Sequence, residues 1–269
     1  MLSLCPLTLL PCSPLELIDA ATDAGFDAVG IRLTPVLATD IDVMADKPLQ
    51  RAIQKRLSAT KLKVLDVEVL RISPDTDVPG LLPMLQYAGD LGARNIAVTG
   101  VPKADWKPEY ERETARRLAE LCEAASGFGL QPMLEFMAFR SIATIADAFH
   151  MRALADHPNL GICVDALHLQ RSGGTPALLQ TIDQTALACF QLCDAPLQAP
   201  DDLAKEARFG RLYPGEGGLP LREMLMALRA DLPVGVETPD TSRAHLPVLE
   251  RAHLAARRAR DLLAAAGRT

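Results

Sequence analysis

The amino-acid sequence predicts an α/β fold, a (β/α)8 TIM barrel that forms a single domain over residues 1–269. Short apolar runs alternate with helix patterns along the chain, and 269 residues are close to the roughly 250 that such a barrel needs. Each of the last four apolar runs has an acid or amide at or near its end. Because the ends of parallel barrel strands meet at one rim, where reactive side chains collect, this pattern also predicts where a site lies.

Eight apolar runs have the length and composition of buried parallel strands. An open doubly wound sheet, the main competing architecture, usually has a glycine-rich turn after its first strand. Residues 9–15, where that turn would lie, contain no glycine. The expected strands are Leu2–Leu7, Ala28–Arg32, Lys63–Ile72, Asn95–Thr99, Gln131–Phe136, Leu160–Asp165, Leu187–Leu192 and Val234–Glu237.

Helix patterns fill the gaps between these strands. Ser13 and Pro14 precede the first of them and are a favourable N-cap and first-turn pair. The expected helices are Leu15–Ala24, Pro48–Thr60, Gly80–Leu91, Pro108–Phe128, Ile142–Ala155, Pro176–Ile182, Leu221–Arg229 and Leu246–Ala266. One long segment, Asp194–Pro220, has no regular pattern, and loops of that length inside compact domains are often functional lids.

Composition limits the classes of function. The net charge of −6 and the pI of about 5.4 disfavour binding to the phosphates of duplex nucleic acid. No segment approaches the roughly 20 uncharged apolar residues that span a bilayer, and the N-terminus lacks the basic start of a secretion signal. Cys163 and Cys189 lie in apolar runs and are expected to be buried free thiols. We therefore expect a cytoplasmic protein that binds a small molecule, without nucleic acid or membrane partners.

Four polar residues, one from each of the last four strands, are expected to meet at the rim. Three of them are carboxylates, which would repel one another strongly unless a cation lay between them. The donor atoms are all oxygen, which favours one Mg²⁺ or Mn²⁺ ion, with Co²⁺ and Zn²⁺ as further options. The predicted metal ligands are Glu135, Asp165, Gln191 and Glu237. Since strand side chains alternate between faces, Met133, Cys163, Cys189 and Gly235 are expected to form a packed layer beneath them.

Further polar residues are candidates for substrate binding. His168 follows Asp165 by three residues, and a neutral imidazole can bind substrate or donate a proton. Arg208 and Arg211 lie in the long loop and suit a phosphate or carboxylate, which arginine binds through two parallel hydrogen bonds. In the same loop, Glu216 is expected to anchor the chain.

Two residues of the third strand run, Glu68 and Arg71, either reach the mouth of the barrel or pair with each other. Arg32 closes the second strand and, like Arg208 and Arg211, would suit a carboxylated substrate. Arg32 and Glu68 therefore complete the set of expected substrate-binding residues.

The chain resembles the sugar phosphate isomerase/epimerase family, which has the xylose isomerase-like TIM barrel. The matching segments are Leu-Glu-Phe at 134–136, Asp-Ala-Leu-His at 165–168, Phe-Gln-Leu-Cys-Asp-Ala-Pro at 190–196, Pro-Gly-Glu-Gly at 214–217 and Val-Glu-Thr at 236–238. The resemblance implies that the four rim residues bind one divalent metal, and that Glu135 and Glu237 act as acid and base. Many members have histidine where this chain has Gln191, and glutamate where it has Arg32.

These features predict a metal-dependent isomerase or epimerase of a sugar, sugar phosphate or related hydroxy-carbonyl compound, with Glu135, Glu237 and His168 as catalytic residues. The alternative is a metal-dependent dehydratase, because residues 191–196 and 211–217 are similar to those of 3-dehydroshikimate dehydratases. AP endonucleases share the barrel, but their metal sites are rich in histidine. A barrel that binds ligands without turnover and a homo-oligomer formed through the last helix both stay open.

Overall fold

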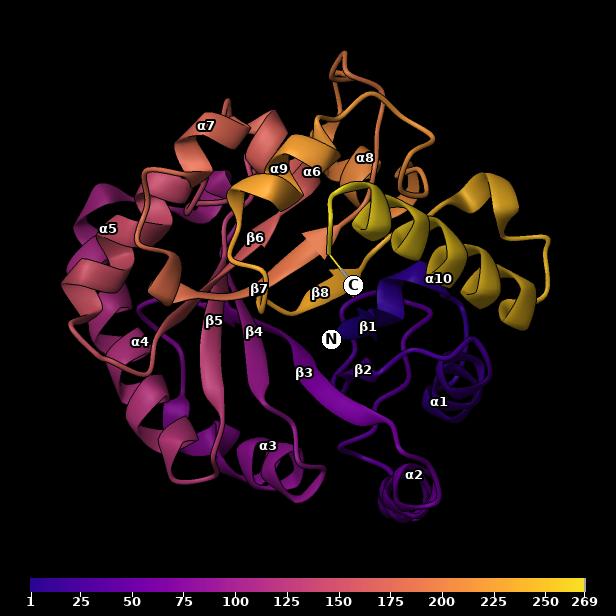
Figure 1. Cartoon of the computed structure of the whole chain (residues 1–269). Coiled ribbons are helices and arrows are strands. Elements are labelled where there is room, and N and C mark those ends of the chain that lie inside the picture. Colours follow the sequence, from indigo (N-terminus) through magenta and orange to yellow (C-terminus); the bar gives the residue numbers. More distant parts are fainter. Residues whose placement is uncertain (269) are drawn as a thin grey trace.

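The computed structural model describes residues 1–268, and its eight parallel strands form a closed barrel with helices outside (Figure 1). The strands follow one another in chain order around the barrel, and β8 pairs with β1 to close it. The predicted fold class is therefore confirmed. Thr269, the last residue of the predicted domain, lies outside the described residues. The strands are β1 Leu2–Leu4, β2 Ala28–Arg32, β3 Lys63–Ile72, β4 Asn95–Gly100, β5 Gln131–Glu135, β6 Gly161–Asp165, β7 Leu187–Leu192 and β8 Val234–Val236.

Most strand boundaries agree with the sequence prediction to within one residue, and the first strand is the main exception. It ends at Leu4, and the chain then forms a 3-10 turn at Pro6–Thr8. Proline has no N–H group to donate to a neighbouring strand and its φ is fixed, so it ends the strand and begins the turn. Glu237 lies one residue beyond the end of β8.

Ten α-helices and five 3-10 turns connect the strands within the described residues. The predicted Ser13 cap is confirmed: its hydroxyl accepts a hydrogen bond from the N–H of Glu16, and the Glu16 carboxylate accepts one from the N–H of Ser13. The helices are α1 Pro14–Asp23, α2 Lys47–Ser58, α3 Val78–Asp90, α4 Glu111–Ser126, α5 Ile145–Ala155, α6 Ala166–Arg171, α7 Pro176–Leu179, α8 Leu203–Phe209, α9 Leu221–Ala227 and α10 Val248–Ala265; the 3-10 turns are η1 Pro6–Thr8, η2 Lys103–Asp105, η3 Pro108–Tyr110, η4 Gln184–Ala186 and η5 Thr241–Arg243.

Two of these helices were not predicted. Helix α6 begins directly after β6, where the Asp165 carboxylate accepts a hydrogen bond from the N–H of His168. Helix α8 lies inside Asp194–Pro220, so the prediction that this segment is wholly irregular is wrong. Asp202 caps α8 by accepting a hydrogen bond from the N–H of Lys205. Both helices are too short to give a clear periodic pattern in the sequence.

The barrel interior contains a small apolar layer, separate from the main core between strands and helices. Met133, Cys163 and Cys189 are buried in this layer, as predicted. Gly235 completes it, because a Cβ at that position would lie only 2.8 Å from the sulfur of Cys5. The polar rim residues therefore stand on a dry, packed base.

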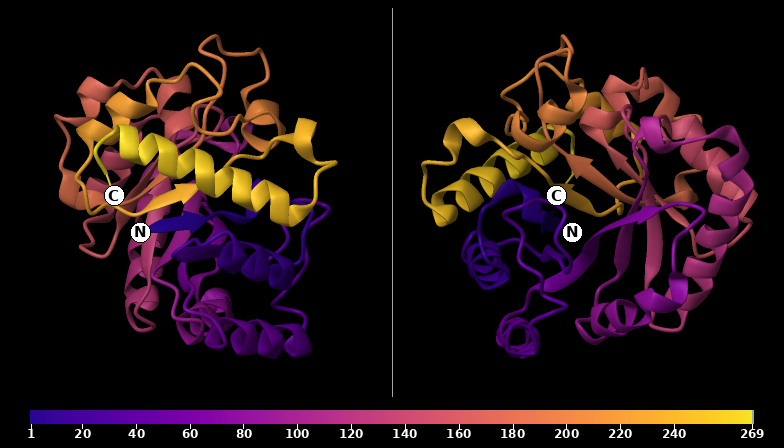
Figure 2. Two further views of the ribbon diagram at one scale, coloured as in Figure 1. Left: turned by 45° about the vertical axis from the view of Figure 1, so that its right-hand side comes forward. Right: turned by 180° about the vertical axis from the view of Figure 1, so that it is seen from behind.

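Helix α10 lies across the seam between β1 and β8 in all views (Figures 1 and 2). It packs against α1 and β8 through a face of small buried residues, which allow close approach. Arg251 on this helix is buried and donates hydrogen bonds to the carbonyl oxygens of Thr8, Leu9 and Leu10. The expectation that the last helix packs on the barrel is confirmed. Among the described residues, none of the helices combines the length and apolar character needed to cross a membrane.

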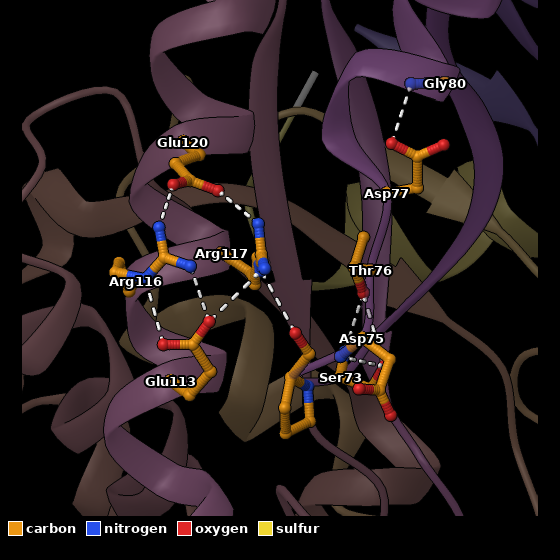
Figure 3. A network of polar contacts seen from close by, with 10 residues as sticks. Ser73, Asp75, Thr76, Asp77, Gly80, Glu113, Arg116, Arg117 and Glu120 are labelled. Carbon is orange, nitrogen blue, oxygen red and sulfur yellow. Dashed lines mark hydrogen bonds and ion pairs between the residues drawn. The ribbon is translucent and has the colours of Figure 1, made fainter.

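On the outer surface, α4 is joined to the loop that follows β3 (Figure 3). The guanidinium of Arg117 donates a hydrogen bond of 3.0 Å to the carbonyl oxygen of Pro74 and pairs with Glu120. Arg116 pairs with Glu113 and Glu120 on the same helix. Exposed ion pairs of this kind contribute about 0–1 kcal/mol each, so the fold depends mainly on the buried layers.

Candidate active site

One pocket opens at the C-terminal rim of the barrel, with about 670 Å³ of empty space when its mouth is included. Every predicted site residue except Asp165 lines it, and Asp165 is completely buried in contact with the lining residue Arg211. The predicted residues in the lining are Arg32, Glu68, Glu135, His168, Gln191, Arg208, Arg211 and Glu237.

Strands β5 and β6 bring Glu135, Asp165 and His168 together. Their ligand atoms all lie within 4.8 Å of one another, and His168 Nε2 is 3.8 Å from Glu135 Oε1. The cap of α6 fixes this arrangement, because Asp165 Oδ1 accepts a 2.9 Å hydrogen bond from the backbone N–H of His168. Burial lowers the pKa of His168 to about 4 even though Asp165 opposes the shift, so the imidazole is neutral near pH 7.

Arg211 lies between two of the predicted metal ligands. Its Nη1 atom is 2.5 Å from Asp165 Oδ2 and 3.1 Å from Glu237 Oε2, and its side chain is 2% exposed. Burial would raise the pKa of Asp165, but the charges of Arg211 and His168, together with hydrogen bonds from both residues, outweigh burial and lower it. Sequence analysis assigned Arg211 to a substrate anion, whereas in the structure it contacts the carboxylates of the site itself.

The two glutamates predicted to act as acid and base both bind protons more tightly than usual. Burial, followed by the charges of Glu237 and Asp165, raises the pKa of Glu135 well above its ordinary value. Burial also raises the pKa of Glu237, to about 7, although Arg211 opposes the shift. A carboxyl group with a pKa near 7, as for Glu237, can give or take a proton near neutral pH, which is what general acid–base catalysis requires.

Several buried acceptors at the rim have no hydrogen-bond donor among the described residues. Glu135 Oε1 and Gln191 Oε1 are both buried and unpartnered, as is Glu68 Oε1. An excess of oxygen acceptors over donors fits a divalent cation, and the donor set is of the kind that binds hard metal ions. Glu135, Asp165 and Gln191 would hold it. Glu237 groups instead with Cys5 and Glu68, so the four predicted ligands do not form one cluster in this arrangement.

Arg32 and Glu68, register partners on the adjacent strands β2 and β3, form an ion pair at the rim of the barrel. One nitrogen of the Arg32 guanidinium lies 3.1 Å from Glu68 Oε2 and the other lies 3.0 Å from Asp40 Oδ2. Glu68 therefore pairs with Arg32, and the alternative pairing with Arg71 is wrong. Arg71 lines the pocket, in agreement with the alternative prediction that the polar residues of the third strand reach the mouth of the barrel.

The loop that carries Arg211 is anchored by Asp194. One carboxylate oxygen accepts hydrogen bonds from the N–H groups of Gly215 and Gly217, and the other accepts from Ala195 and Leu219. A Cβ at Gly217 would lie 2.4 Å from this carboxylate, so glycine is needed there for the close approach. Sequence reasoning did not single out Asp194.

Glu216, at the tip of the same loop, pairs with Arg243 at 2.6 Å and with Arg258 of α10 at 3.1 Å. Its predicted role as a loop anchor is confirmed.

Phe139 and Arg140 are further pocket residues that sequence reasoning missed. They follow β5 by a few residues, and barrel sites are built from the loops that follow strands. That position was the one signal in the sequence that could have identified them. Arg140 is buried, with 6% of its surface exposed.

The fold and the rim together define a (β/α)8 barrel whose pocket holds two buried glutamates of raised pKa and unpartnered oxygen atoms among the described residues. The chain belongs to the xylose isomerase-like TIM barrel family, whose model matches residues 18–265. The predicted family resemblance is therefore confirmed, and the named relatives are enzymes that act on small molecules.

Two curated relatives and one solved structure illustrate the similarity. A 3-dehydroshikimate dehydratase of Pseudomonas aeruginosa is 33% identical over 109 residues, which are 40% of this chain and 17% of that protein. An inosose isomerase of Halalkalibacterium halodurans is 26% identical over 125 residues, 46% of this chain and 43% of that protein. The matches thus span less than half of either relative. The IOLI protein, solved with a bound zinc atom, superposes with a TM-score of 0.84 at 19% identity over 98% of each chain.

Proposed function

We propose that this protein is a divalent-cation-dependent enzyme that removes a proton next to a carbonyl group and eliminates water from a hydroxy-keto substrate. The observation that carries the proposal is the pairing of Glu135 and Glu237 in one pocket, both buried and both with a raised pKa. The local similarity to a 3-dehydroshikimate dehydratase supports elimination as the reaction.

In the proposed reaction, one glutamate accepts the proton from the carbon next to the carbonyl. The other donates a proton to the β-hydroxyl, which leaves as water, and a double bond forms between the two carbons. Neutral His168 lies close enough to Glu135 to hold the substrate hydroxyl or to pass a proton. When bound by Glu135, Asp165 and Gln191, a divalent cation supplies Lewis acidity that makes the C–H bond next to the carbonyl more acidic.

The second candidate is isomerisation or epimerisation of a hydroxy-carbonyl compound. It shares the first proton transfer and differs only in that the proton returns to carbon, without loss of water. The similarity to an inosose isomerase favours it, as does the presence of a second carboxyl group, Glu237, that can return the proton.

Two assays separate these reactions. The protein is incubated with Mg²⁺ or Mn²⁺ and either 3-dehydroshikimate or a panel of keto-sugars and inososes in deuterated water. Dehydration raises the ultraviolet absorbance as a conjugated product forms, whereas isomerisation and epimerisation introduce deuterium without that rise. Glu237→Gln is expected to abolish either signal. If neither absorbance nor deuterium content changes with any substrate, the proposal of proton abstraction fails.

We also propose that residues 1–269 act as one domain in the cytoplasm on a small-molecule substrate. A homo-oligomer through α10 is a further proposal, tested by light scattering of the purified protein.

A further inference from the structure

The pocket is lined by five arginines and three glutamates. Two of its arginines, Arg32 and Arg211, are engaged in buried ion pairs. The other three, Arg71, Arg140 and Arg208, have no acidic partner in the part of the chain that the structure describes. Guanidinium groups that lack a carboxylate and face a cavity are available to an anionic ligand.

Arg140 is the most deeply placed of the three. Its side chain is almost fully buried, and its Nε atom has no hydrogen-bond partner within residues 1–268. The backbone N–H of Arg140 donates to the carbonyl of Met137 at 2.7 Å, and the residue forms a bridge with Pro102, so the chain holds it firmly at the pocket wall. A buried cation without a counter-ion is costly unless a ligand supplies one.

Phe139 contacts two of these arginines. The guanidinium carbons of Arg140 and Arg208 each lie 5.7 Å from the centre of the Phe139 ring. Burial, with added repulsion from Arg71 and Arg208, lowers the pKa of Arg140 although Glu135 and Asp105 oppose the shift, so both neighbouring arginines act on Arg140. An oxyanion placed among them would relieve this repulsion.

We propose that Arg71, Arg140 and Arg208 form an oxyanion-binding subsite that recognises a carboxylate group on the substrate. The inference rests on the proposed function and narrows its substrate to a hydroxy-keto acid. Its location suits that role, because the Phe139 ring also contacts the His168 ring edge-on at 5.7 Å, and His168 lies beside Glu135. A carboxylate held by the arginines would therefore place the rest of a small substrate against the acid–base residues.

Calorimetry with a non-reacting ligand tests the subsite without turnover. Shikimate carries the carboxylate but has no ketone, its methyl ester lacks the charge, and inorganic phosphate provides a different oxyanion. The wild-type protein is expected to bind shikimate more tightly than the ester. Arg140→Met should weaken shikimate binding by about ten-fold or more, the usual loss for a hydrogen bond to a charged group, and leave ester binding unchanged. Arg51→Met, an exposed arginine on α2, is the matched control.

Several results would overturn the proposal. If Arg140→Met binds shikimate as tightly as the wild type does, the subsite proposal is wrong. It is also wrong if neither shikimate nor phosphate binds the wild-type protein at millimolar concentration. Arg140-dependent binding of phosphate alone excludes the carboxylate and assigns the subsite to a phosphorylated substrate. If Arg140→Met does not fold, Arg208→Met, at a half-buried position, gives the same comparison.

The experiments distinguish a failure of the proposed function from a failure of the subsite proposal. Arg140-dependent shikimate binding without any turnover would leave the subsite intact and refute the dehydratase. Full dehydration of 3-dehydroshikimate by Arg140→Met, at the wild-type KM, would refute only the subsite.

Discussion

Nη1 of Arg211 lies 2.5 Å from Oδ2 of Asp165, and both side chains are almost entirely buried. The same nitrogen reaches Glu237, so one guanidinium neutralises carboxylates from β6 and from the end of β8. The protein thus has its own cation beside the oxygens that sequence analysis assigned to a metal. Two cations near the same oxygens compete, and the consequences of that competition can be measured.

Replacing Arg211 with methionine leaves Asp165 and Glu237 buried without their counter-ion. Breaking a buried pair in this way costs about 3–5 kcal/mol, and we expect that loss in the free energy of unfolding of chelator-treated protein. Added Mn²⁺ should restore part of it, since the oxygens become free to bind the ion. Urea unfolding with and without Mn²⁺ measures both effects. Arg211→Lys retains the charge and serves as control; equal stability of Arg211→Met and the wild type would contradict the prediction.

Gln191 is expected to contribute to cation binding because its side-chain oxygen is buried and has no donor. In chelator-treated protein, Gln191→Leu should weaken Mn²⁺ binding by at least about ten-fold, while Gln191→His should retain it. Titration calorimetry gives the affinities, and Gln198→Leu, at an exposed position, is the control. Unaltered Mn²⁺ affinity in Gln191→Leu would exclude this residue from the site.

His168 is expected to stay neutral well below its ordinary pKa of 6.5, because burial lowers the pKa to about 4. Between these values the unfolded chain takes up a proton that the folded protein does not. The free energy of unfolding should therefore fall as the pH drops from 6.5 towards 4. His168→Asn should have a shallower slope over this range than the wild type, with the exposed His245→Asn as control. An imidazole NMR titration near pH 6.5 for His168 would disprove the shift.

Asp194→Ala should loosen the loop that carries Arg211. The substitution leaves four backbone N–H groups without their acceptor, and each unsatisfied buried group costs about 1–3 kcal/mol. We expect a loss of at least about 2 kcal/mol in urea unfolding, since water reaches some of these groups. Asp202→Ala, which removes only the cap of α8, provides a comparison. A smaller effect for Asp194→Ala than for Asp202→Ala would rule out the anchoring role.

Much of the fold followed from local patterns. The strand boundaries and the apolar layer under the rim depend on residue type and on the alternation of side chains between faces. These two features can be predicted from a single sequence. The placement of Glu135, Asp165 and Gln191 at the rim followed for the same reason, since each lies at or near the end of its strand.

The pairings in the loops could not be predicted in the same way. Arg211 and Asp165 are 46 residues apart, and their contact depends on α8 and on the Asp194 anchor. The burial of Arg140 against Phe139 depends on how the loop after β5 folds back towards β4. The residues next to Arg140 in the sequence do not indicate this. Such contacts depend on tertiary packing, which residue spacing along the chain does not determine.

Closure of the barrel has a consequence for biosynthesis. Strand β1 pairs with β8, and Arg251 bonds to the carbonyls of Thr8, Leu9 and Leu10. Of the eight barrel strands, β1 is synthesised first and β8 last. Strand β1 can pair with β2 early, whereas its other edge has its partner only when β8 has been made. Until then, that edge of β1 is open to water, and the barrel closes only after β8 has been synthesised.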